Sequence, residues 1–379
     1  MADPVHLTLL IGPAVPVPAP REVTDALTEV QVTTSAEPGA ASGFQLVFSI
    51  SNQSPLYTLF LLAGGAAAAL PIMRVIVVVT VRGRPDVLID GVVTKTDVSG
   101  GTGAQPAKLT VTGVDLTAVM NLIDFSGIPY PAMPPPARVL LILAKYAILG
   151  IIPLVVPSFL TDVPIPVQRI PRQQGKDLEY INHLADEAGY VFYITPGPAP
   201  GSNVAYWGPQ IKVGVPQPAL NVDMGPHTNV ESLSFTFDSE SKTLPVVFVH
   251  NQETKVPIPV PIPDISPLNP PLGLIPPIPK RIEPVPGTAK RSLIEAALLG
   301  MARAARSSDA VKGTGSLDVV RYGRVLKARQ LVGVRGAGPP FDGLHFVERV
   351  THTITRGEYK QSFSLNRNGL LSTVPVVPA

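Results

Sequence analysis

Proline is the residue that most limits how this chain can fold, because 44 of its 379 residues are prolines. A proline fixes φ and has no backbone N–H, so it is tolerated at turns, on edge strands and in extended segments. The prolines follow no regular period, which excludes a collagen helix, and the many Val, Ile, Leu and Phe residues between them exclude disorder. Edge strands, turns and ordered extended segments remain.

The densest proline segment runs from Val256 to Gly287, where Pro alternates with β-branched residues. Every second residue there is unable to donate a hydrogen bond to a sheet, so we expect polyproline II or an extended arm along a sheet edge. Its apolar residues favour docking on the same subunit or on a neighbouring one over a free linker.

The first third of the chain has the pattern of β-strands. Runs rich in β-branched residues are separated by clusters of Gly, Pro, Ser or Asn, and their spacing suits a small antiparallel barrel. We therefore assign residues 1–121 to a first tube-like β-barrel domain, in which residues 56–70 are ambiguous between a loop and a short helix. The expected strands are Val5–Ile11, Glu29–Thr34, Phe44–Ser51, Met73–Arg82, Val87–Val98 and Ala107–Gly113.

The next part, residues 122–225, is predicted to be a mixed α/β lobe. Leu116–Leu122 and Ala137–Ile148 have helical patterns, with Leu140 and Leu143 on one apolar stripe. The clearest element is a helix over residues 177–188, for which Asp177 is the expected N-cap. Gly189 stands at the C′ position of this helix, and a strand follows from Tyr190 to Ile194.

Residues 226–370 are predicted to form a second β-barrel domain, which includes the proline-rich arm (256–287) and a helix (292–306) with a capping box at Ser292 and Glu295. Residues 371–379 form a C-terminal tail. The expected fold class is mainly β (α+β), with two small antiparallel tube-like β-barrel domains and an intervening mixed α/β lobe. The expected strands are Ser232–Asp238, Val246–His250, Leu317–Val325, Ala328–Val334, Leu344–Ile354 and Glu358–Leu365.

The charge pattern limits the choice of partners. Charged residues make up 15% of the chain, where about 25% is usual, and the net charge is only +2 without a basic block. We therefore expect no nucleic-acid binding, and a surface that is covered by other subunits. The N-terminus shows no secretory signal. The apolar run Val139–Val156 contains Lys145 and Pro153, which favours a buried helix followed by an extended segment over a membrane span.

The titratable residues give no convincing catalytic or metal site. The best cluster is His345, Glu348 and His352, but on a regular strand His345 points away from the other two, so hydrogen-bonded strand residues are the preferred interpretation. His183 and Glu187 are one helical turn apart and read as a surface pair.

The glycine motifs give no cofactor site either. Gly100, Gly101 and Gly103 lack the following helix of a phosphate-binding loop, which favours a hairpin tip. Gly313, Gly315 and the RGRP sequence at Arg82–Pro85 indicate turns. We expect no enzyme activity, no cofactor and no metal.

Two segments resemble a known family, the phage late-control gene D family, which includes tail hubs and the N-terminal part of type VI secretion spike proteins. The first is the helix and strand from Gly175 to Ile194, followed by an aromatic-Gly-Pro triplet. The matching positions are Gly175, Asp177, Leu178, Gly189, Tyr190, Phe192, Trp207 and Gly208.

The second segment is the closing hairpin, DGLHFVERVTHTITRGEYKQSFSLNR. It resembles the family's final pattern of a Gly, a strand with V-x-H, a turn, Gly-x-Tyr and a strand that ends in Arg. The matching positions are Gly343, Val350, His352, Gly357, Tyr359, Phe363 and Arg367.

The resemblance implies a structural baseplate hub that adapts a hexameric inner tube to a trimeric spike. The implied partners are two further copies of the chain in a homotrimer, the inner tube protein, a separate spike protein, because the chain ends at Ala379 soon after the hairpin, and other baseplate components. The implied location is the baseplate of a phage tail-like particle assembled in the bacterial cytoplasm. A tail-associated cell-wall hydrolase and a secreted carbohydrate-binding β protein are the alternative functions.

Overall fold

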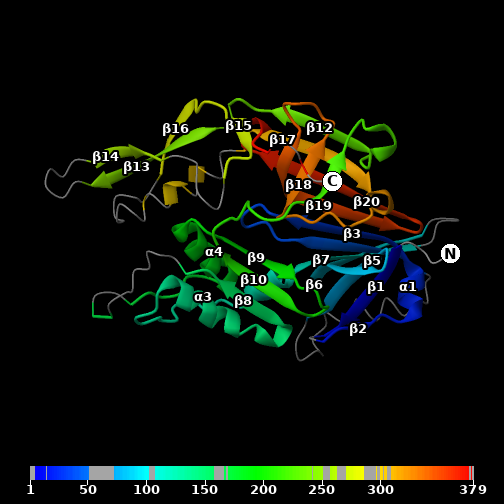
Figure 1. Ribbon diagram of the computed structural model, residues 1–379. Helices are drawn as coiled ribbons and strands as arrows, with labels where there is room; N and C mark the ends of the chain where they lie inside the picture. Colours follow the sequence, from blue (N-terminus) through cyan, green and yellow to red (C-terminus); the bar gives the residue numbers. More distant parts are fainter. Residues whose placement is uncertain are drawn as a thin grey trace.

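The computed structural model describes residues 5–13, 15–50, 72–101, 107–157, 166–167, 170–240, 242–250, 257–262, 270–285, 296, 299–301, 303–304, 309–374 and 377. Strands dominate these residues, and most of them belong to one large sheet on the right of Figure 1. The predicted mainly β class is confirmed. Residues 56–70, which were ambiguous in the sequence, lie outside the described ranges.

Six strands near the N-terminus form one half of the large sheet, in the antiparallel order β1-β5-β6-β7-β4-β3. Side chains alternate between buried and partly exposed in β4 and β7, as expected where one face of a strand meets the core. The predicted strands are confirmed to within a few residues at each end. Their bounds are β1 Val5–Gly12, β3 Leu27–Ser35, β4 Gly43–Ile50, β5 Arg74–Val81, β6 Arg84–Ser99 and β7 Ala107–Asp115.

Strands near the C-terminus continue the same sheet. β19 pairs with β3 over residues 349–355, and β20, β17 and β12 follow in that order. The described strands of this 13-stranded sheet form an open path from β12 to β2. The two strand-rich ends of the sequence therefore share one sheet. The bounds are β11 Gln217–Asn221, β12 Ser232–Phe237, β17 Val311–Asp318, β18 Leu331–Arg335, β19 Gly343–Thr355 and β20 Glu358–Arg367.

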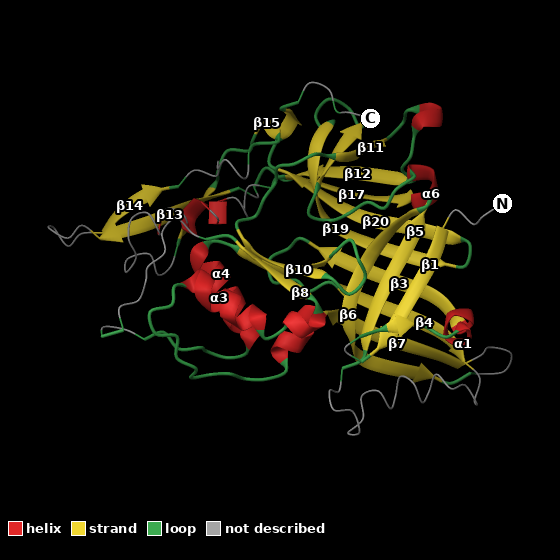
Figure 2. Cartoon of the chain, turned by 60° about the horizontal axis from the view of Figure 1, so that its bottom comes forward, coloured by secondary structure: helices red, strands yellow, loops and turns green. Residues whose placement is uncertain are grey.

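The middle of the chain forms an α/β lobe beside the large sheet. The helices α3 and α4 lie on one face of a three-stranded sheet with the order β8-β10-β9 (Figure 2). Helix α3 begins with two prolines, which are tolerated in the first turn of a helix. The bounds are η1 Leu116–Asn121, α3 Pro135–Ala144, η2 Ala147–Leu149, β8 Ile151–Val155, α4 Asp177–Ala188, β9 Val191–Pro196 and β10 Asn203–Gly208.

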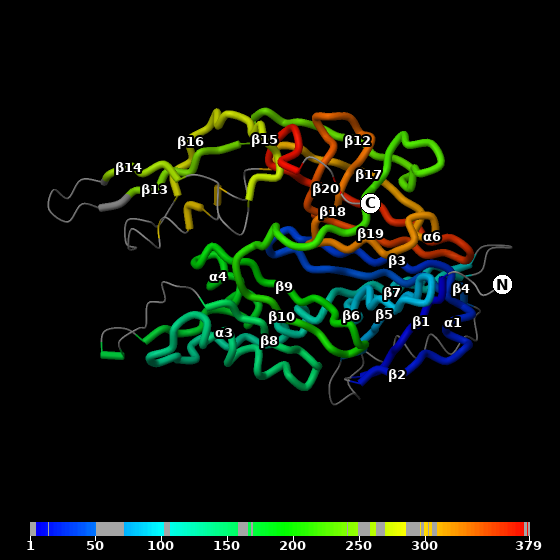
Figure 3. The backbone as a smooth tube through the Cα atoms, viewed as in Figure 1, coloured from blue at the N-terminus to red at the C-terminus, as the bar shows by residue number. Residues whose placement is uncertain are grey.

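The described parts of the proline-rich arm contact other parts of the same subunit. This is one of the two expected arrangements, the other being docking on a neighbouring subunit. β14 pairs with one side of β13 and β16 with the other, in a small sheet that projects on the left of Figure 3. Ile262 and Val285 pack with Leu299 from the predicted helix 292–306, of which residues 296, 299–301, 303 and 304 are described and helical. The bounds are β13 Thr243–His250, β14 Pro257–Pro261, β15 Gly273–Ile275, β16 Arg281–Pro284 and β21 Leu370–Ser372.

Two predictions about strands and turns in the C-terminal part are wrong. Leu317–Val325 is not one strand, because the Asp318 side chain accepts a hydrogen bond from the Arg321 N–H and starts the short helix α6 (Val319–Tyr322). Gly313 and Gly315 lie within β17, not in a turn. The structure also contains short elements that the sequence did not indicate, among them β2 (Val17–Pro18), α1 (Arg21–Ala26) and η3 (Gly225–His227).

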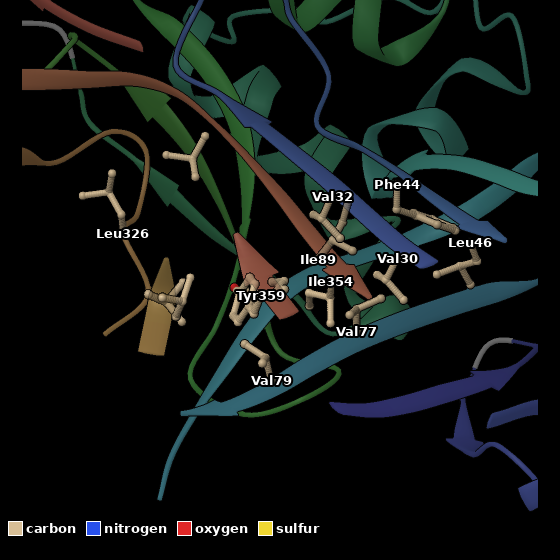
Figure 4. Close-up of a cluster of buried hydrophobic side chains, with 14 of the residues drawn as sticks. Val30, Val32, Phe44, Leu46, Val77, Val79, Ile89, Leu326, Ile354 and Tyr359 are labelled. Carbon is tan, nitrogen blue, oxygen red and sulfur yellow. The ribbon is translucent and has the colours of Figure 1, made fainter. Parts of the chain in front are cut away.

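One hydrophobic core joins the N-terminal and C-terminal strands. Val30, Val77 and Ile89 come from the first half of the sheet, and Ile354 and Tyr359 come from the closing hairpin (Figure 4). A second core fills the lobe. The closing hairpin is therefore packed into the N-terminal half of the protein.

Candidate functional site

The first signature segment begins at a turn ahead of α4. Gly175 has a φ of +73°, which favours glycine, and its N–H donates to Ser126 Oγ at 2.9 Å. The Lys176 N–H donates to Glu179 Oε2 at 3.2 Å, so the N-cap is Lys176. The expectation that Asp177 is the N-cap is wrong, because Asp177 is the first residue of the helix and its side chain is buried.

Asp177 instead anchors α4 through a buried hydrogen-bond network. Its Oδ1 accepts from Gln173 Nε2 at 2.6 Å, and its Oδ2 accepts from the Tyr146 hydroxyl at 2.7 Å and pairs with Lys145 Nζ at 2.6 Å. Gln173 Oε1 accepts from the Tyr130 hydroxyl at 2.6 Å. Burial, together with the Asp177 charge, raises the pKa of Tyr130 to about 12. Asp177 therefore ties α4 to the segments on either side of α3.

The end of α4 places an aromatic cluster in the lobe core. Gly189 has a φ of +71°, as predicted for a C′ glycine, and the Tyr190 N–H donates to the Ala185 carbonyl at 2.7 Å. The Tyr190 ring meets Trp207 edge-on, with centroids 4.8 Å apart. Trp207 is fully buried and packs in the same core as Phe192.

Leu178 and Gly208 complete this part of the signature. Leu178 is partly buried and packs against the lobe core. Gly208 leaves room for a neighbouring ring, because a Cβ there would lie 2.6 Å from the Tyr206 hydroxyl. That hydroxyl donates to the Pro209 carbonyl at 2.7 Å.

The second signature segment centres on a buried pair in the closing hairpin. Gly357 forms the turn with a φ of +86°, and Tyr359 lies opposite Ile354, two residues along from His352. The Tyr359 hydroxyl and His352 Nδ1 form a hydrogen bond at 2.8 Å. Burial lowers the pKa of His352 to about 3, so the imidazole is neutral. Val350, on the same strand as His352, is buried in the large hydrophobic core.

Gln361 extends this pair to the next segment of the chain. Its Nε2 donates to the Leu326 carbonyl at 2.8 Å, and its Oε1 accepts from the Leu326 N–H at 3.0 Å. The Gln361 side chain thus forms hydrogen bonds with both the backbone N–H and the backbone carbonyl of Leu326. The buried side chains of His352, Tyr359 and Gln361 therefore hold the segment before β18 against the closing hairpin.

Arg367 closes the second signature at the end of β20. Its side chain is fully buried and donates to the carbonyl oxygens of Gly369 at 2.7 Å and Asp342 at 2.9 Å, and to that of Pro340. Gly343 has a φ of +120°, and a Cβ there would lie 2.3 Å from Ser372 Oγ. Phe363 lies in the large core. These residues fold the C-terminal tail against the start of β19.

The candidate metal cluster is not assembled. A β-bulge between Val347 and Arg349 changes the side on which the following residues point, so the predicted sharing of one face by Glu348 and His352 is wrong. Glu348 Oε1 accepts from Asn366 Nδ2 at 3.2 Å, while His352 bonds to Tyr359. No group of three His, Asp or Glu side chains within the described ranges has the spacing of a metal site. His183 Nε2 lies 3.9 Å from Glu187 Oε2 on the helix surface, as expected.

The signature residues form two separate buried clusters, one in the lobe and one in the closing hairpin. Their side chains hold elements in place, and their glycines allow turns or close contacts. The signature thus marks residues that build the fold.

Sequence reasoning missed a buried ion pair that joins the lobe to the large sheet. Arg74 Nη2 lies 2.6 Å from Asp90 Oδ2, and both side chains are almost fully buried. The same Arg74 nitrogen donates to the Leu149 carbonyl at 2.8 Å, and Asn203 Nδ2 donates to Asp90 Oδ2 at 2.8 Å. The available signal was an Arg and an Asp within otherwise apolar strands.

Two exposed apolar surfaces lie on the lobe and on the arm. On the lobe, Ile148 is 77% exposed, and Ile152 and Leu154 of the edge strand β8 are more than half exposed. On the arm, Ile278 is 81% exposed and Ile282 is 72% exposed. The predicted stripe on α3 is partly wrong, because Leu140 faces outward while Val139 and Ile142 are buried. Among the described helices, none has the length and apolar composition to cross a membrane.

Sequence comparisons found neither a matching family model nor a matching curated protein. Among solved structures, the tail protein from Neisseria meningitidis MC58 matches 97% of this chain and 98% of its own, with a TM-score of 0.64 and 12% identity. The chain has the fold of phage tail proteins. The 43 kDa tail protein of prophage MuSo2 from Shewanella oneidensis agrees, with 96% and 98% coverage, a TM-score of 0.59 and 16% identity.

The tail-protein fold also occurs in secretion machines. The E. coli c3393 protein, a type VI secretion component with structural similarity to T4 tail proteins gp27 and gp5, matches 93% of this chain and 76% of its own, with a TM-score of 0.52 and 12% identity. A chain of the Francisella PdpA-VgrG complex matches 99% of this chain and 60% of its own, with a TM-score of 0.57 and 6% identity. The resemblance inferred from the two signature segments is confirmed at the level of the fold.

Proposed function

We propose that this chain is a structural, non-enzymatic hub in the baseplate of a contractile tail-like machine, where it adapts a hexameric inner tube to a trimeric spike. The observation that carries the proposal is the end-to-end match to two phage tail proteins, each covered over 98% of its length. A match of this extent leaves little of the chain for a separate catalytic domain. The signature residues support the proposal because their roles are structural.

The proposed assembly is a homotrimer in which residues 1–121 and 226–370 act as two tube-like units in each subunit. Three copies would then present six similar units to the tube and threefold symmetry to the spike. The exposed apolar residues on the lobe and the arm support burial against other subunits, because a chain with 15% charged residues gains solubility by covering such surfaces. Other baseplate proteins are the remaining proposed partners.

Native mass spectrometry tests this assembly. The purified chain would be measured alone and then with tube and spike proteins from the same genome. We expect a three-copy species that binds both partners, either at once or when the partners are added. A folded monomer that stays monomeric with both partners present would refute the hub function.

A peptidoglycan zymogram tests the non-enzymatic part of the proposal. We expect no clearing by the purified chain, since the buried carboxylates of Asp90, Asp115 and Asp177 are held in ion pairs or hydrogen bonds within the fold. Clearing that survives repurification would establish the cell-wall hydrolase alternative. Recovery of the chain in tail-like particles assembled in the bacterial cytoplasm would support the proposed location.

A further inference from the structure

A cavity of about 440 Å³ lies beside the turn that joins β5 to β6. This turn is the start of the RGRP sequence, and its two central residues, Arg82 and Gly83, have φ values of +48° and +78°. The first residues of β6 line the cavity, together with residues 215–218 and part of the segment between α6 and β18. Three segments that are far apart in the sequence thus meet here.

The cations that line this cavity outnumber the carboxylates. Arg84, Arg324 and Lys327 line it, and Asp86 is the one carboxylate among the described lining residues. Lys327 Nζ pairs with Asp86 Oδ1 at 2.5 Å. Within the described part of the chain, neither Arg84 nor Arg324 forms an ion pair, and both are exposed. Two other cavities have the opposite balance, with more carboxylates than cations. The fold therefore gathers an excess of positive charge at this one.

A third arginine is held next to the cavity by the turn. Arg82 Nη2 donates to the Val320 carbonyl at 2.8 Å. The guanidinium of Arg82 covers Gly323, because a Cβ on Gly323 would lie 2.7 Å from Arg82 Nη1. Gly323 is itself one of the lining residues. The turn thus adds a positioned guanidinium to the charges of the cavity.

The segments that line the cavity are tied to one another and carry apolar surface. Gln217 Nε2 donates to the Lys327 carbonyl at 2.9 Å, and Gln217 Oε1 accepts from the Lys327 N–H at 2.8 Å. The Tyr322 hydroxyl donates to the Pro218 carbonyl at 2.6 Å. Val215, which also lines the cavity, is 91% exposed. Charges of one sign beside walls of low dielectric constant focus their field, so the cavity attracts a negatively charged group.

The chemistry of the lining residues selects the class of that group. Guanidinium groups bind carboxylates and phosphates through parallel hydrogen bonds. Single-stranded nucleic acid is disfavoured, because its bases stack on aromatic side chains and none of the described lining residues is aromatic. The exposed hydrocarbon of Val215 and of the neighbouring prolines favours a ligand with apolar groups beside its negative charges. A protein segment has such groups, and a free phosphate does not.

We propose that this cavity is a docking site for an acidic segment of a partner protein. Carboxylates of that segment pair with Arg84 and Arg324, and its apolar side chains lie against Val215 and the prolines at 216 and 218. Docking requires only a partner with such a segment, so the site stands whether or not the protein acts as a hub.

Fluorescence anisotropy with a labelled hexaglutamate peptide and the full chain tests the site. We expect saturable binding at low salt that weakens as the salt concentration rises. The double variant Arg84→Glu, Arg324→Glu should bind at least about tenfold more weakly, because it places like charges against the peptide. The matched control is Lys108→Glu, Arg303→Glu, which changes the net charge equally at exposed residues outside the cavity. This control should bind as the wild type does.

Two further ligands separate a protein segment from other anions. A peptide that alternates Glu and Leu should bind more tightly than one that alternates Glu and Ser, because only the former has apolar side chains for Val215 and the prolines. The reverse order, no saturable binding of hexaglutamate, or equal weakening by the two double variants would overturn the proposal. Tighter binding of inorganic phosphate or of an oligonucleotide at Arg84 and Arg324 would also overturn it and assign the site to phosphate groups.

Discussion

At the residue scale, glycines in this protein do more than form turns. Gly313 and Gly315 lie within β17, where aromatic rings from neighbouring strands occupy the space that a Cβ atom would need. A Cβ on Gly315 would lie 2.4 Å from the Ser232 carbonyl oxygen and 2.8 Å from the Phe363 ring. The strand can therefore pack closely against β12 and β20 only because the side chain is missing.

We expect Gly315→Ala to lower the free energy of unfolding by about 1–3 kcal/mol, because the added methyl group overpacks the contact with a backbone oxygen that has little freedom to move. Urea denaturation monitored by circular dichroism measures the change. Gly100→Ala is the control, since no heavy atom lies within 4 Å of the position of its Cβ. Equal stability of the two variants would contradict this account of β17.

Two buried histidines make stability depend on pH. Burial lowers the pKa of His352 to about 3, and burial together with the nearby charge of Arg367 lowers that of His345 to about 3. In the unfolded chain a histidine has a pKa near 6.5, so below this pH the unfolded state binds protons that the folded state does not. Stability is therefore complete above pH 6.5 and is lost as the pH falls toward 3.

We expect the free energy of unfolding to fall between pH 6.5 and 5, with a slope that approaches about 1.4 kcal/mol per pH unit for each histidine. Urea denaturation across this range measures the slope. His352→Gln should reduce it by about half, whereas His183→Gln should not, because His183 is exposed on α4. A slope that His352→Gln leaves unchanged would show that other groups cause the pH dependence.

At the element scale, residues 272–275 of the proline-rich arm are bound to the chain that follows the closing hairpin. The N–H groups of Leu272 and Gly273 both donate to Asn368 Oδ1, at 2.9 and 3.0 Å, and β15 pairs with β21. Leu272 packs with Leu331 and Phe346 in a small separate core. The arm is thus held by side-chain and backbone contacts at its middle.

We expect Leu272→Ala to lower the free energy of unfolding by about 2–4 kcal/mol, as is usual for a buried leucine. Ile278→Ala should change it by less than about 0.5 kcal/mol, because Ile278 is 81% exposed. Urea denaturation compares the two variants in the isolated chain. If Ile278→Ala proves to be the more harmful of the two, the described docking of the arm is not its position in solution.

At the scale of the whole molecule, the lobe is joined to the large sheet by polar contacts as well as by packing. Arg74 is central, because it pairs with Asp90 and also donates to main-chain oxygens of Leu149 and Gly201 in the lobe. Among the described residues, truncating Arg74 leaves the buried Asp90 carboxylate with a side-chain hydrogen bond from Asn203. The position of the lobe therefore depends on one arginine.

We expect Arg74→Ala to lower the free energy of unfolding by about 3–5 kcal/mol and to increase hydrogen exchange in η2 and β10. Lys95→Ala should change stability by less than about 1 kcal/mol, because the Lys95–Asp97 pair is exposed. Urea denaturation and hydrogen-exchange mass spectrometry measure the two effects. Wild-type exchange in the lobe of Arg74→Ala would contradict this function of Arg74.

Local sequence patterns were enough to predict the positions of most strands, the helix over residues 177–188, the turns at Gly189 and Gly357, and the resemblance to tail proteins. These features depend on local patterns of apolar residues and on turn chemistry, which a short stretch of sequence contains. Contacts between distant parts of the chain determine that β19 pairs with β3, that a bulge turns Glu348 away from His352, and that Asp177 and Arg74 are buried. Strand partners and buried polar contacts join residues far apart in the chain, so no local pattern specifies them.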